Sequence, residues 1–291
     1  MSITLDILFL KLRAYLELMK LRLSWLLAFS GAFGYSLGID KVEWLPLTIF
    51  LFAAFCITGA ANIINQIIEI DLDKLMKRTQ NRPLPSGRVS TREAVWLAIV
   101  LFAVSTILFF VEFNLRACAL AVLSTILYGF VYTPLKKVGP IAVFVGAIPG
   151  AFPPMIGWVA ATNQFGLEPG ILFAIQFIWQ FPHFWAIAWV LDEDYKKAGF
   201  RLLPSKGGKD LSTAIQIMIY TLFLLPVGWL PYELGMTGIN SALVAMLFGV
   251  LFLAQTFHLM RKCSDKTALQ LMFGSFIYLP IVQIAYLLDK I

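Results

Sequence analysis

The chain has 291 residues, of which 59% are hydrophobic and 14% are charged, and its mean hydropathy is +0.80. A soluble domain carries about a quarter charged residues, so this composition excludes a soluble globular protein and indicates a helical membrane protein. The formal charge of +6 does not indicate nucleic-acid binding, because basic residues in membrane proteins mainly set the topology.

The predicted elements begin with a short amphipathic helix. Residues 8–21 are basic and amphipathic, which predicts an interfacial helix leading into the first span. Nine stretches that follow are long and apolar enough to cross a bilayer as helices. They are residues 22–39, 45–68, 94–112, 115–132, 139–161, 170–190, 212–231, 239–259 and 268–288. No soluble domain interrupts them, so we expect one all-α membrane domain over residues 1–291.

Basic residues gather in every second connection between these spans. Of the 23 Lys and Arg residues, all but Lys41, Arg116 and Lys290 fall on one side. The positive-inside rule makes that side cytoplasmic in a bacterial inner membrane, with the N-terminus inside and the C-terminus outside. Both long connections, residues 69–93 and 191–211, lie on this side, and each begins with acidic residues. Long connections are where functional residues tend to lie.

The second predicted span ends in a first acidic segment. Asn65, Glu69 and Asp73 are spaced i, i+4, i+8, so they share one face if the helix continues. Carboxylates stacked in this way repel each other, and a magnesium ion with a pyrophosphate would relieve the repulsion. Arg78 and Arg82, in the Pro- and Gly-containing stretch that follows, would donate to the same phosphates.

The alternative for this segment is a solvated helix end with ordinary membrane-flanking charge. Three polar residues inside the apolar span, Asn62, Asn65 and Gln66, favour the functional interpretation. Polar groups within a span are costly, and they tend to mark sites.

A second acidic segment, with Asp192 and Asp194, ends the sixth predicted span. On a helix these two carboxylates would point about 200° apart, so one could bind a second magnesium ion while the other orients a basic residue. A charge run in a loop is the alternative. Between the two segments lies Lys136, which could neutralise a leaving group, and Tyr132, which could equally be a membrane-belt residue.

His183 lies in the middle of the sixth predicted span, one turn after Gln180 and directly after Pro182. A lone His inside a span commonly hydrogen-bonds a neighbouring helix. The flanking aromatic residues, and the carbonyl that Pro182 frees, would also suit a flat aromatic acceptor or a haem iron.

The segment Asn65–Leu84 resembles the first aspartate-rich motif of the intramembrane UbiA-type prenyltransferases. Its Met76–Thr79 stretch, followed by Asn81 and Arg82, is similar to the protohaem IX farnesyltransferase (haem O synthase) branch. Further similar stretches are Pro149–Gly157, Trp179–His183, Asp194–Gly199 and Leu203–Pro204.

Two positions depart from the superfamily pattern. Glu69 stands where the pattern has Asp, and it keeps a carboxylate for the metal. The second motif usually repeats Asp at four-residue spacing, whereas here Asp192 is followed by Lys196 and Asp194 by Ala198. Lys196 would then substitute for the charge of a second metal ion.

The resemblance implies a UbiA-type fold of nine transmembrane helices around a central cavity. It also implies transfer of a farnesyl group from farnesyl pyrophosphate to a vinyl group of haem B, with water addition, giving haem O and pyrophosphate for haem–copper oxidase maturation. Mg²⁺ is the expected counter-ion of the pyrophosphate, and haem B is a substrate. The expected partners are membrane lipid and, in oxidase assembly, haem A synthase or the terminal oxidase, with no nucleic acid.

The resemblance also implies a set of site residues. The metal ligands would be Asn65, Glu69, Asp73, Asp192 and Asp194, the pyrophosphate ligands Arg78, Arg82, Tyr132, Lys136 and Lys196, and the haem contacts Gln180 and His183. Of these, Asn65, Glu69, Asp73, Asp194 and Lys136 are the expected catalytic residues. His183 would be either an axial iron ligand or a base that helps to deliver water.

Three other functions fit part of the sequence. A prenyltransferase for a quinone precursor would share the first motif, but the haem-branch stretches and His183 argue against it. A transporter for an anionic substrate would use polar residues at the membrane midplane, whereas here they gather on one side. A non-catalytic assembly subunit would have no use for the acidic ladder.

Overall fold

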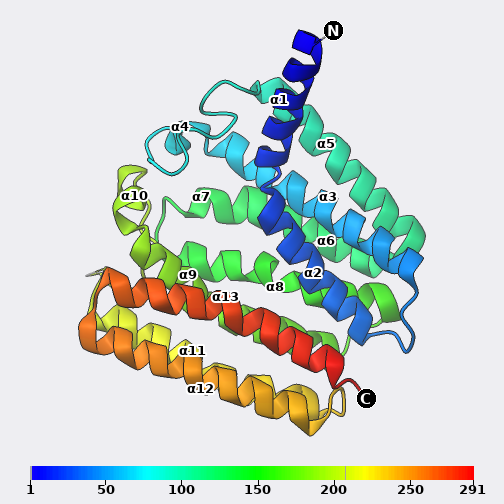
Figure 1. Ribbon diagram of the computed structural model, residues 1–291, viewed down its shortest axis with the longest axis vertical. Helices are drawn as coiled ribbons and strands as arrows, with labels where there is room; N and C mark the ends of the chain where they lie inside the picture. The colour runs from blue at the N-terminus through cyan, green and yellow to red at the C-terminus, as the bar shows by residue number, and fades with distance from the viewer. Residues whose placement is uncertain (1, 207) are drawn as a thin grey trace.

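A computed structural model describes residues 2–206 and 208–291 of the chain. Met1, in the predicted domain, and Gly207, in the predicted 191–211 connection, lie outside the described residues. The described chain folds into helices, with its longest connections after α4 and after α10 (Figure 1). The helices are α1 (Ser2–Leu18), α2 (Leu21–Leu37), α3 (Trp44–Ile68), α4 (Ile70–Asp73), α5 (Thr91–Leu108), η1 (Phe109–Phe113), α6 (Leu115–Ile126), η2 (Leu127–Tyr132), α7 (Thr133–Leu135), α8 (Ile141–Thr162), α9 (Leu167–Val190), α10 (Asp192–Lys197), α11 (Leu211–Glu233), α12 (Ile239–Lys262) and α13 (Asp265–Leu288).

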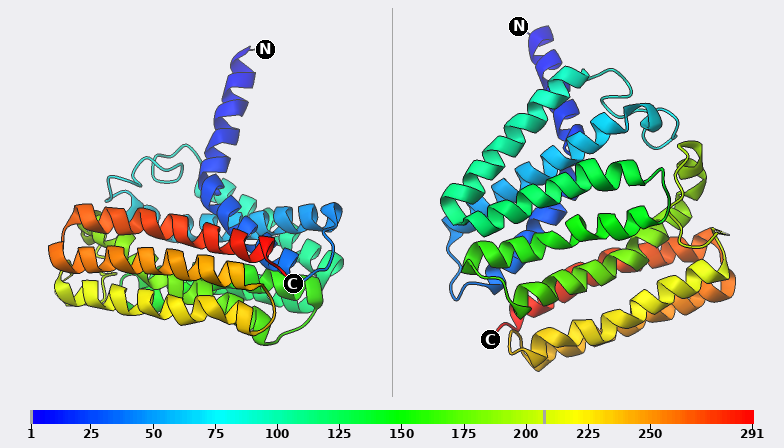
Figure 2. Two further views of the ribbon diagram at one scale, coloured as in Figure 1. Left: turned by 60° about the horizontal axis from the view of Figure 1, so that its bottom comes forward. Right: turned by 180° about the vertical axis from the view of Figure 1, so that it is seen from behind.

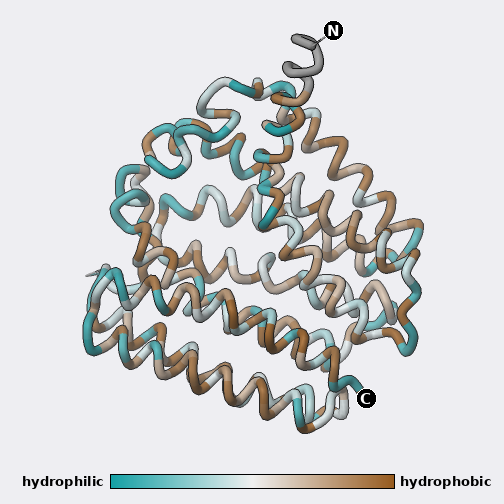
Figure 3. The backbone as a smooth tube through the Cα atoms, in the orientation of Figure 1, coloured by the Kyte–Doolittle hydropathy of each residue, from teal (hydrophilic) through white to brown (hydrophobic). Residues whose placement is uncertain are grey.

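The prediction of an all-α membrane bundle is confirmed. In the described residues, eight helical runs are long and apolar enough to cross a membrane, and they match the predicted second to ninth spans. The first predicted span corresponds to α2, which has 17 residues and would extend about 25 Å. It packs against α3 and α8 within the same bundle. Hydrophilic residues gather at the ends of the bundle, around α4 and α10 above all (Figure 3).

A helix break separates α1 from α2, within the predicted interfacial helix of residues 8–21. Lys20 adopts a left-handed conformation, with φ 49° and ψ 60°. The break frees two carbonyl groups, which side chains of α3 satisfy. Gln66 Nε2 donates to Leu18 O at 2.6 Å, and Asn62 Nδ2 lies 3.4 Å from Met19 O. Asn62 and Gln66 thus stabilise the break, and their interpretation as markers of the acidic site stays a prediction.

Helix α1 itself leaves the bundle and crosses the direction of its helices (Figure 2). Two ion pairs connect it to the first turn of α5 and to the connection that precedes α5. Lys11 lies 2.5 Å from Glu93, and Arg88 lies 2.7 Å from Glu17. Its apolar residue Phe9 is exposed. An interfacial position of α1 stays a prediction, with the helix ending at Leu18 and not at residue 21.

A polar side chain of α9 replaces a backbone hydrogen bond that a proline removes from α8. Pro154 has no backbone N–H, so the carbonyl of Gly150, four residues earlier, loses its partner within the helix. Gln176 Nε2 of α9 donates to that carbonyl oxygen at 2.8 Å. Such replacement donors are required in a bilayer, where water cannot serve. This hydrogen bond also fixes the position of α9 along the axis of α8.

Glycines bring α2 and α8 into backbone contact. A Cβ atom added to Gly157 would overlap the carbonyl oxygen of Gly31, and one added to Gly34 would overlap that of Pro154. Small residues at helix crossings are the usual means of close packing in membranes.

Replacing Gly157 by Ala would therefore force α2 and α8 apart. We expect a lower unfolding temperature in detergent, because a methyl group forced into a closed contact costs about 1–3 kcal/mol. Gly170→Ala in α9 is the matched control, since nothing lies within 4 Å of the added Cβ. Its unfolding temperature should be unchanged or slightly higher. Equal effects of the two substitutions would contradict the close packing.

Candidate active site

The first acidic segment forms one buried face where α3 passes into α4. Glu69, at the joint, has φ −98° and ψ 11°. The backbone bonds from Glu69 N to Asn65 O (3.0 Å) and from Asp73 N to Glu69 O (2.8 Å) nevertheless keep the helical spacing. The side chains of Asn65, Glu69 and Asp73 are buried, and Asn65 Nδ2 donates to Glu69 Oε2 at 3.0 Å.

Each buried carboxylate of this face has a cationic partner from another part of the chain. Lys136 Nζ lies 2.8 Å from Glu69 Oε1 and donates to Oε2 at 3.0 Å. Arg82 NH1 donates to both oxygens of Asp73, at 2.7 and 2.9 Å. Burying a carboxylate without a partner costs several kcal/mol of folding free energy. The two carboxylates can therefore be buried only because these cations lie beside them.

Aromatic rings and a threonine complete the surroundings of Lys136. Its Nζ lies 4.9 Å from the ring centroid of Tyr132 and 5.7 Å from that of Phe200, and both rings are buried. Thr133 Oγ1 accepts a hydrogen bond from Asn65 Nδ2 at 3.0 Å. Tyr132 and Thr133 follow one another at the end of the π-helical segment η2, and such segments are frequent at functional sites. Thr133 and Phe200 carried no signal in the sequence that distinguishes them from packing residues.

Lys20 is a further cation of this site, which the sequence analysis assigned only to topology. Its Nζ donates to Asn65 Oδ1 at 3.3 Å. Burial, and then the neighbouring cations Arg82 and Lys136, lower the pKa of the Lys20 amine. The residue reaches the site only because the chain breaks between α1 and α2, and a left-handed lysine could not be predicted from the sequence.

Asp194 of the second acidic segment contacts the connection that follows α4. Its Oδ1 accepts the backbone N–H of Lys77, and its Oδ2 accepts that of Arg78, both at 3.1 Å. Lys197 Nζ donates to Oδ1 at 3.1 Å. Partial burial acts to raise the pKa of Asp194, but these hydrogen bonds outweigh it and hold the pKa below its usual value.

Asp192 is paired within its own helix. Its Oδ2 lies 2.7 Å from Nζ of Lys196, one turn later, while the neighbouring Glu193 is exposed. In the described part of the chain, no three His, Cys, Asp or Glu residues gather closely enough to hold a metal by themselves. Asp192 and Asp194 therefore do not form such a cluster with Glu69 and Asp73. Their metal role, and the phosphate role of Lys196, stay predictions.

Gln180 and His183 contact different helices. Gln180 Nε2 donates to Ala147 O of α8 at 2.8 Å, so this side chain is engaged in helix packing. His183 faces α13, where its Nδ1 lies 2.8 Å from Ser275 Oγ, and its ring stacks on Trp179 with centroids 4.3 Å apart.

The hydrogen bonds around His183 assign its tautomer. Ser275 Oγ donates to Met272 O at 2.6 Å, so the same oxygen must accept the proton of His183 Nδ1. Nε2 then keeps a free lone pair, which either an iron ligand or a base requires.

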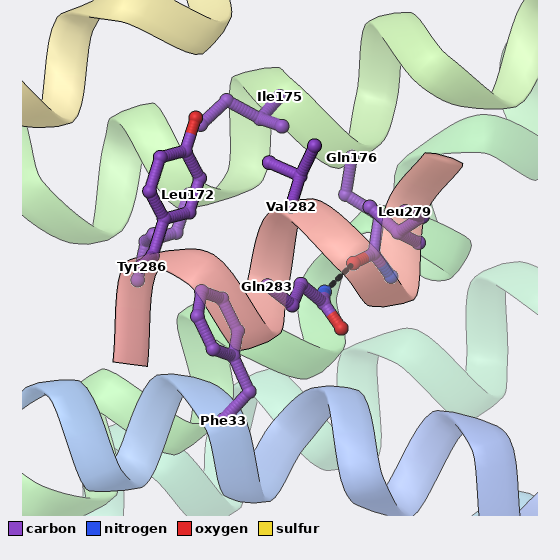
Figure 4. A pocket seen from close by; sticks show the side chains of 8 residues that line it. All are labelled: Phe33, Leu172, Ile175, Gln176, Leu279, Val282, Gln283 and Tyr286. Carbon is purple, nitrogen blue, oxygen red and sulfur yellow. Dashed lines mark hydrogen bonds between the residues drawn. The ribbon is translucent and has the colours of Figure 1, made fainter. Parts of the chain in front are cut away.

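A small, mostly apolar cavity that also contains two glutamine side chains lies between α2, α9 and α13 (Figure 4). Gln283 Nε2 donates to Gln176 Oε1 at 3.1 Å and to Ser30 Oγ at 2.9 Å. The cavity volume is about 10 Å³, which is near the limit for one water molecule. It is too small for a prenyl chain, so a larger central cavity stays a prediction. It is lined by Phe33, Leu172, Ile175, Gln176, Leu279, Val282, Gln283 and Tyr286.

Comparison with known proteins places these features in a family. The UbiA prenyltransferase family matches residues 25–279. A protein named protoheme IX farnesyltransferase from Cytophaga hutchinsonii is 58% identical over 96% of this chain and 98% of its own length. A structure from work on digeranylgeranylglyceryl phosphate synthase has a TM-score of 0.80 at 24% identity, covering 96% of this chain and 98% of that one. A UbiA homologue from Archaeoglobus fulgidus, bound to DMAPP and Mg²⁺, has a TM-score of 0.69 at 16% identity, covering 94% and 98%.

The two solved structures share the fold, and the Cytophaga protein resembles this chain over nearly the whole length of both. The family match includes both acidic segments and His183. The chain therefore belongs to the UbiA prenyltransferase family and, within it, to the protohaem IX farnesyltransferases.

Proposed function

We propose that the protein transfers the farnesyl group of farnesyl pyrophosphate to a vinyl group of haem B, with addition of water. The products are haem O, for haem–copper oxidase maturation, and pyrophosphate. The observation that carries this proposal is the buried face of Asn65, Glu69 and Asp73 at one end of a membrane bundle, with Lys136 and Arg82 against it. By the positive-inside rule, this end faces the cytoplasm of a bacterial inner membrane.

The donor set of this face fits magnesium. Mg²⁺ prefers oxygen ligands and is commonly held by one or two carboxylates together with substrate phosphates. Glu69, Asp73 and the amide oxygen of Asn65 would hold it, and the pyrophosphate would complete its coordination. The Archaeoglobus homologue bound to DMAPP and Mg²⁺ supports this assignment. When bound, the ion would stabilise the charge on the departing pyrophosphate.

The chain's own cations would bind and orient the pyrophosphate. Lys136 and Arg82 already lie beside the carboxylates, and Lys20 contacts Asn65. Each can donate to a phosphate oxygen without leaving the site, and such fixed donors stabilise charge that develops in the transition state. Arg78 and Tyr132 are the remaining candidates for phosphate contact. Buried aromatic rings around Lys136 exclude water, which limits hydrolysis of the allylic cation.

On the acceptor side, His183 is the candidate haem contact. Its free Nε2 could bind the haem iron or take the proton of the water that is added. Gln180 would contribute indirectly, because its amide is engaged with α8.

The proposed reaction is tested by incubating purified protein with haem B, farnesyl pyrophosphate and Mg²⁺, followed by mass analysis of the porphyrin. We expect haem O, and we expect Glu69→Ala with Asp73→Ala to abolish it while haem binding persists. Glu112→Gln, a change of an exposed acidic residue in η1, should keep full activity. An active double variant would refute the role of this face, and turnover of 4-hydroxybenzoate in place of haem would refute the acceptor.

Lys136 and its neighbour Lys137 form a matched pair for a second test. Lys136 contacts Glu69, whereas Lys137 is exposed. Lys136→Met should lower kcat/KM about 10²- to 10³-fold, because a preorganised donor to the leaving group is lost. Lys137→Met should stay close to the wild-type value. Similar losses in both variants would point to a general effect of positive charge.

The role of His183 can be tested with haem spectroscopy. His183→Ala should lower haem O formation about 10²-fold or more, and His258→Ala, at an exposed position of α12, should not. A shift of the Soret band of bound haem B in His183→Ala would identify an iron ligand. An unchanged band with lost product would identify a base. Normal turnover would remove His183 from the site.

A further inference from the structure

The carboxylate of Asp194 connects two segments that lie far apart in the sequence. Its two oxygens accept the backbone N–H groups of the consecutive residues Lys77 and Arg78, and Lys197 donates to the same carboxylate. Hydrogen bonds to an ionised acceptor are about twice as strong as neutral ones. This arrangement holds the backbone from which the Arg78 side chain extends.

A second contact from the same segment reaches Lys136. The chain turns at Gly199, with φ +75°, and Phe200 N donates to Tyr195 O at 2.9 Å. This turn places the buried Phe200 ring 5.7 Å from Lys136 Nζ. The ring of Tyr132 also lies against the same amine, so its position is restricted by two aromatic rings.

The other aspartate of this segment, Asp192, does not complete a metal site. Its carboxylate lies 2.7 Å from Nζ of Lys196. Lys196 is the residue that stands where the superfamily pattern repeats Asp. Both aspartates of this segment are thus engaged by donors of the chain itself.

We infer that residues 192–200 act as a clamp that positions two phosphate-binding cations, Arg78 and Lys136, over the Glu69–Asp73 face. Asp194 is then a positioning residue and not a ligand of a second magnesium ion. The inference rests on the proposed function only where it takes pyrophosphate to be the group that these cations bind.

The clamp and a second metal site predict opposite results for the wild-type protein. If Asp194 stays on the backbone, the amides of Lys77 and Arg78 remain protected from hydrogen–deuterium exchange when magnesium and inorganic pyrophosphate are added. If Asp194 leaves to bind metal, these amides lose protection on that addition, and the inference is overturned. This measurement needs no variant and no turnover.

A substitution tests the same point. Asp194→Ala should speed tryptic cleavage after Lys77 and Arg78 by about tenfold, because hydrogen bonds to a charged acceptor are lost. Glu193→Gln is the matched control, since it removes the same charge from an exposed neighbour. Its cleavage rate should equal that of the wild type.

Kinetics separate positioning from metal binding. Asp194→Ala should raise the KM for farnesyl pyrophosphate about tenfold, with the half-saturating Mg²⁺ concentration unchanged. An unchanged cleavage rate, or a raised half-saturating Mg²⁺ concentration, would overturn the clamp. If the wild type forms no haem O, the proposed function is refuted but the clamp is not. The exchange and cleavage measurements then still decide how Asp194 acts.

Discussion

Two buried carboxylates, Glu69 and Asp73, set the condition that the rest of the site has to meet. Each has nearly no exposed surface, and each would be strongly destabilising without a cation beside it. The two cations come from different connections, Lys136 from the one after α7 and Arg82 from the one after α4. The buried acidic face is therefore stable only when both connections fold back over the end of α3.

The same requirement for partners governs the apolar part of the bundle. At two helix interruptions, a polar side chain of a neighbouring helix donates a hydrogen bond to the carbonyl that lost its partner. Gln66 does so at the break before α2, and Gln176 does so at Pro154 of α8. In a bilayer these contacts are required, since no water is present to replace them. The break that Gln66 stabilises also brings Lys20 to Asn65. A hydrogen bond between two helices therefore helps to position a charged group of the site.

Much of the fold was predictable because it depends on local patterns. Runs of apolar residues predict the spans, and charge predicts which connections share a side. Helical periodicity likewise predicts that Asn65, Glu69 and Asp73 share a face. Partners across the bundle carry no such pattern. Gln66 looks like a site residue in the sequence, yet it binds a helix end. Asp194 looks like a metal ligand, yet its oxygens accept backbone N–H groups whose position only the folded loop determines.

Charge balance also favours a single magnesium ion at the acidic face. Glu69 and Asp73 are already offset by Lys136 and Arg82, so the face is close to neutral before substrate binds. A prenyl pyrophosphate brings roughly three negative charges near neutral pH. One Mg²⁺ would offset two of them, and Lys20, whose pKa is lowered by burial, would offset the third once the pyrophosphate lies beside it. A second Mg²⁺ would need further carboxylates nearby, and the carboxylate of Asp194 is already satisfied by the loop that carries Arg78. On this proposal, the lysine at the helix break and the positioning role of Asp194 follow from the same charge balance.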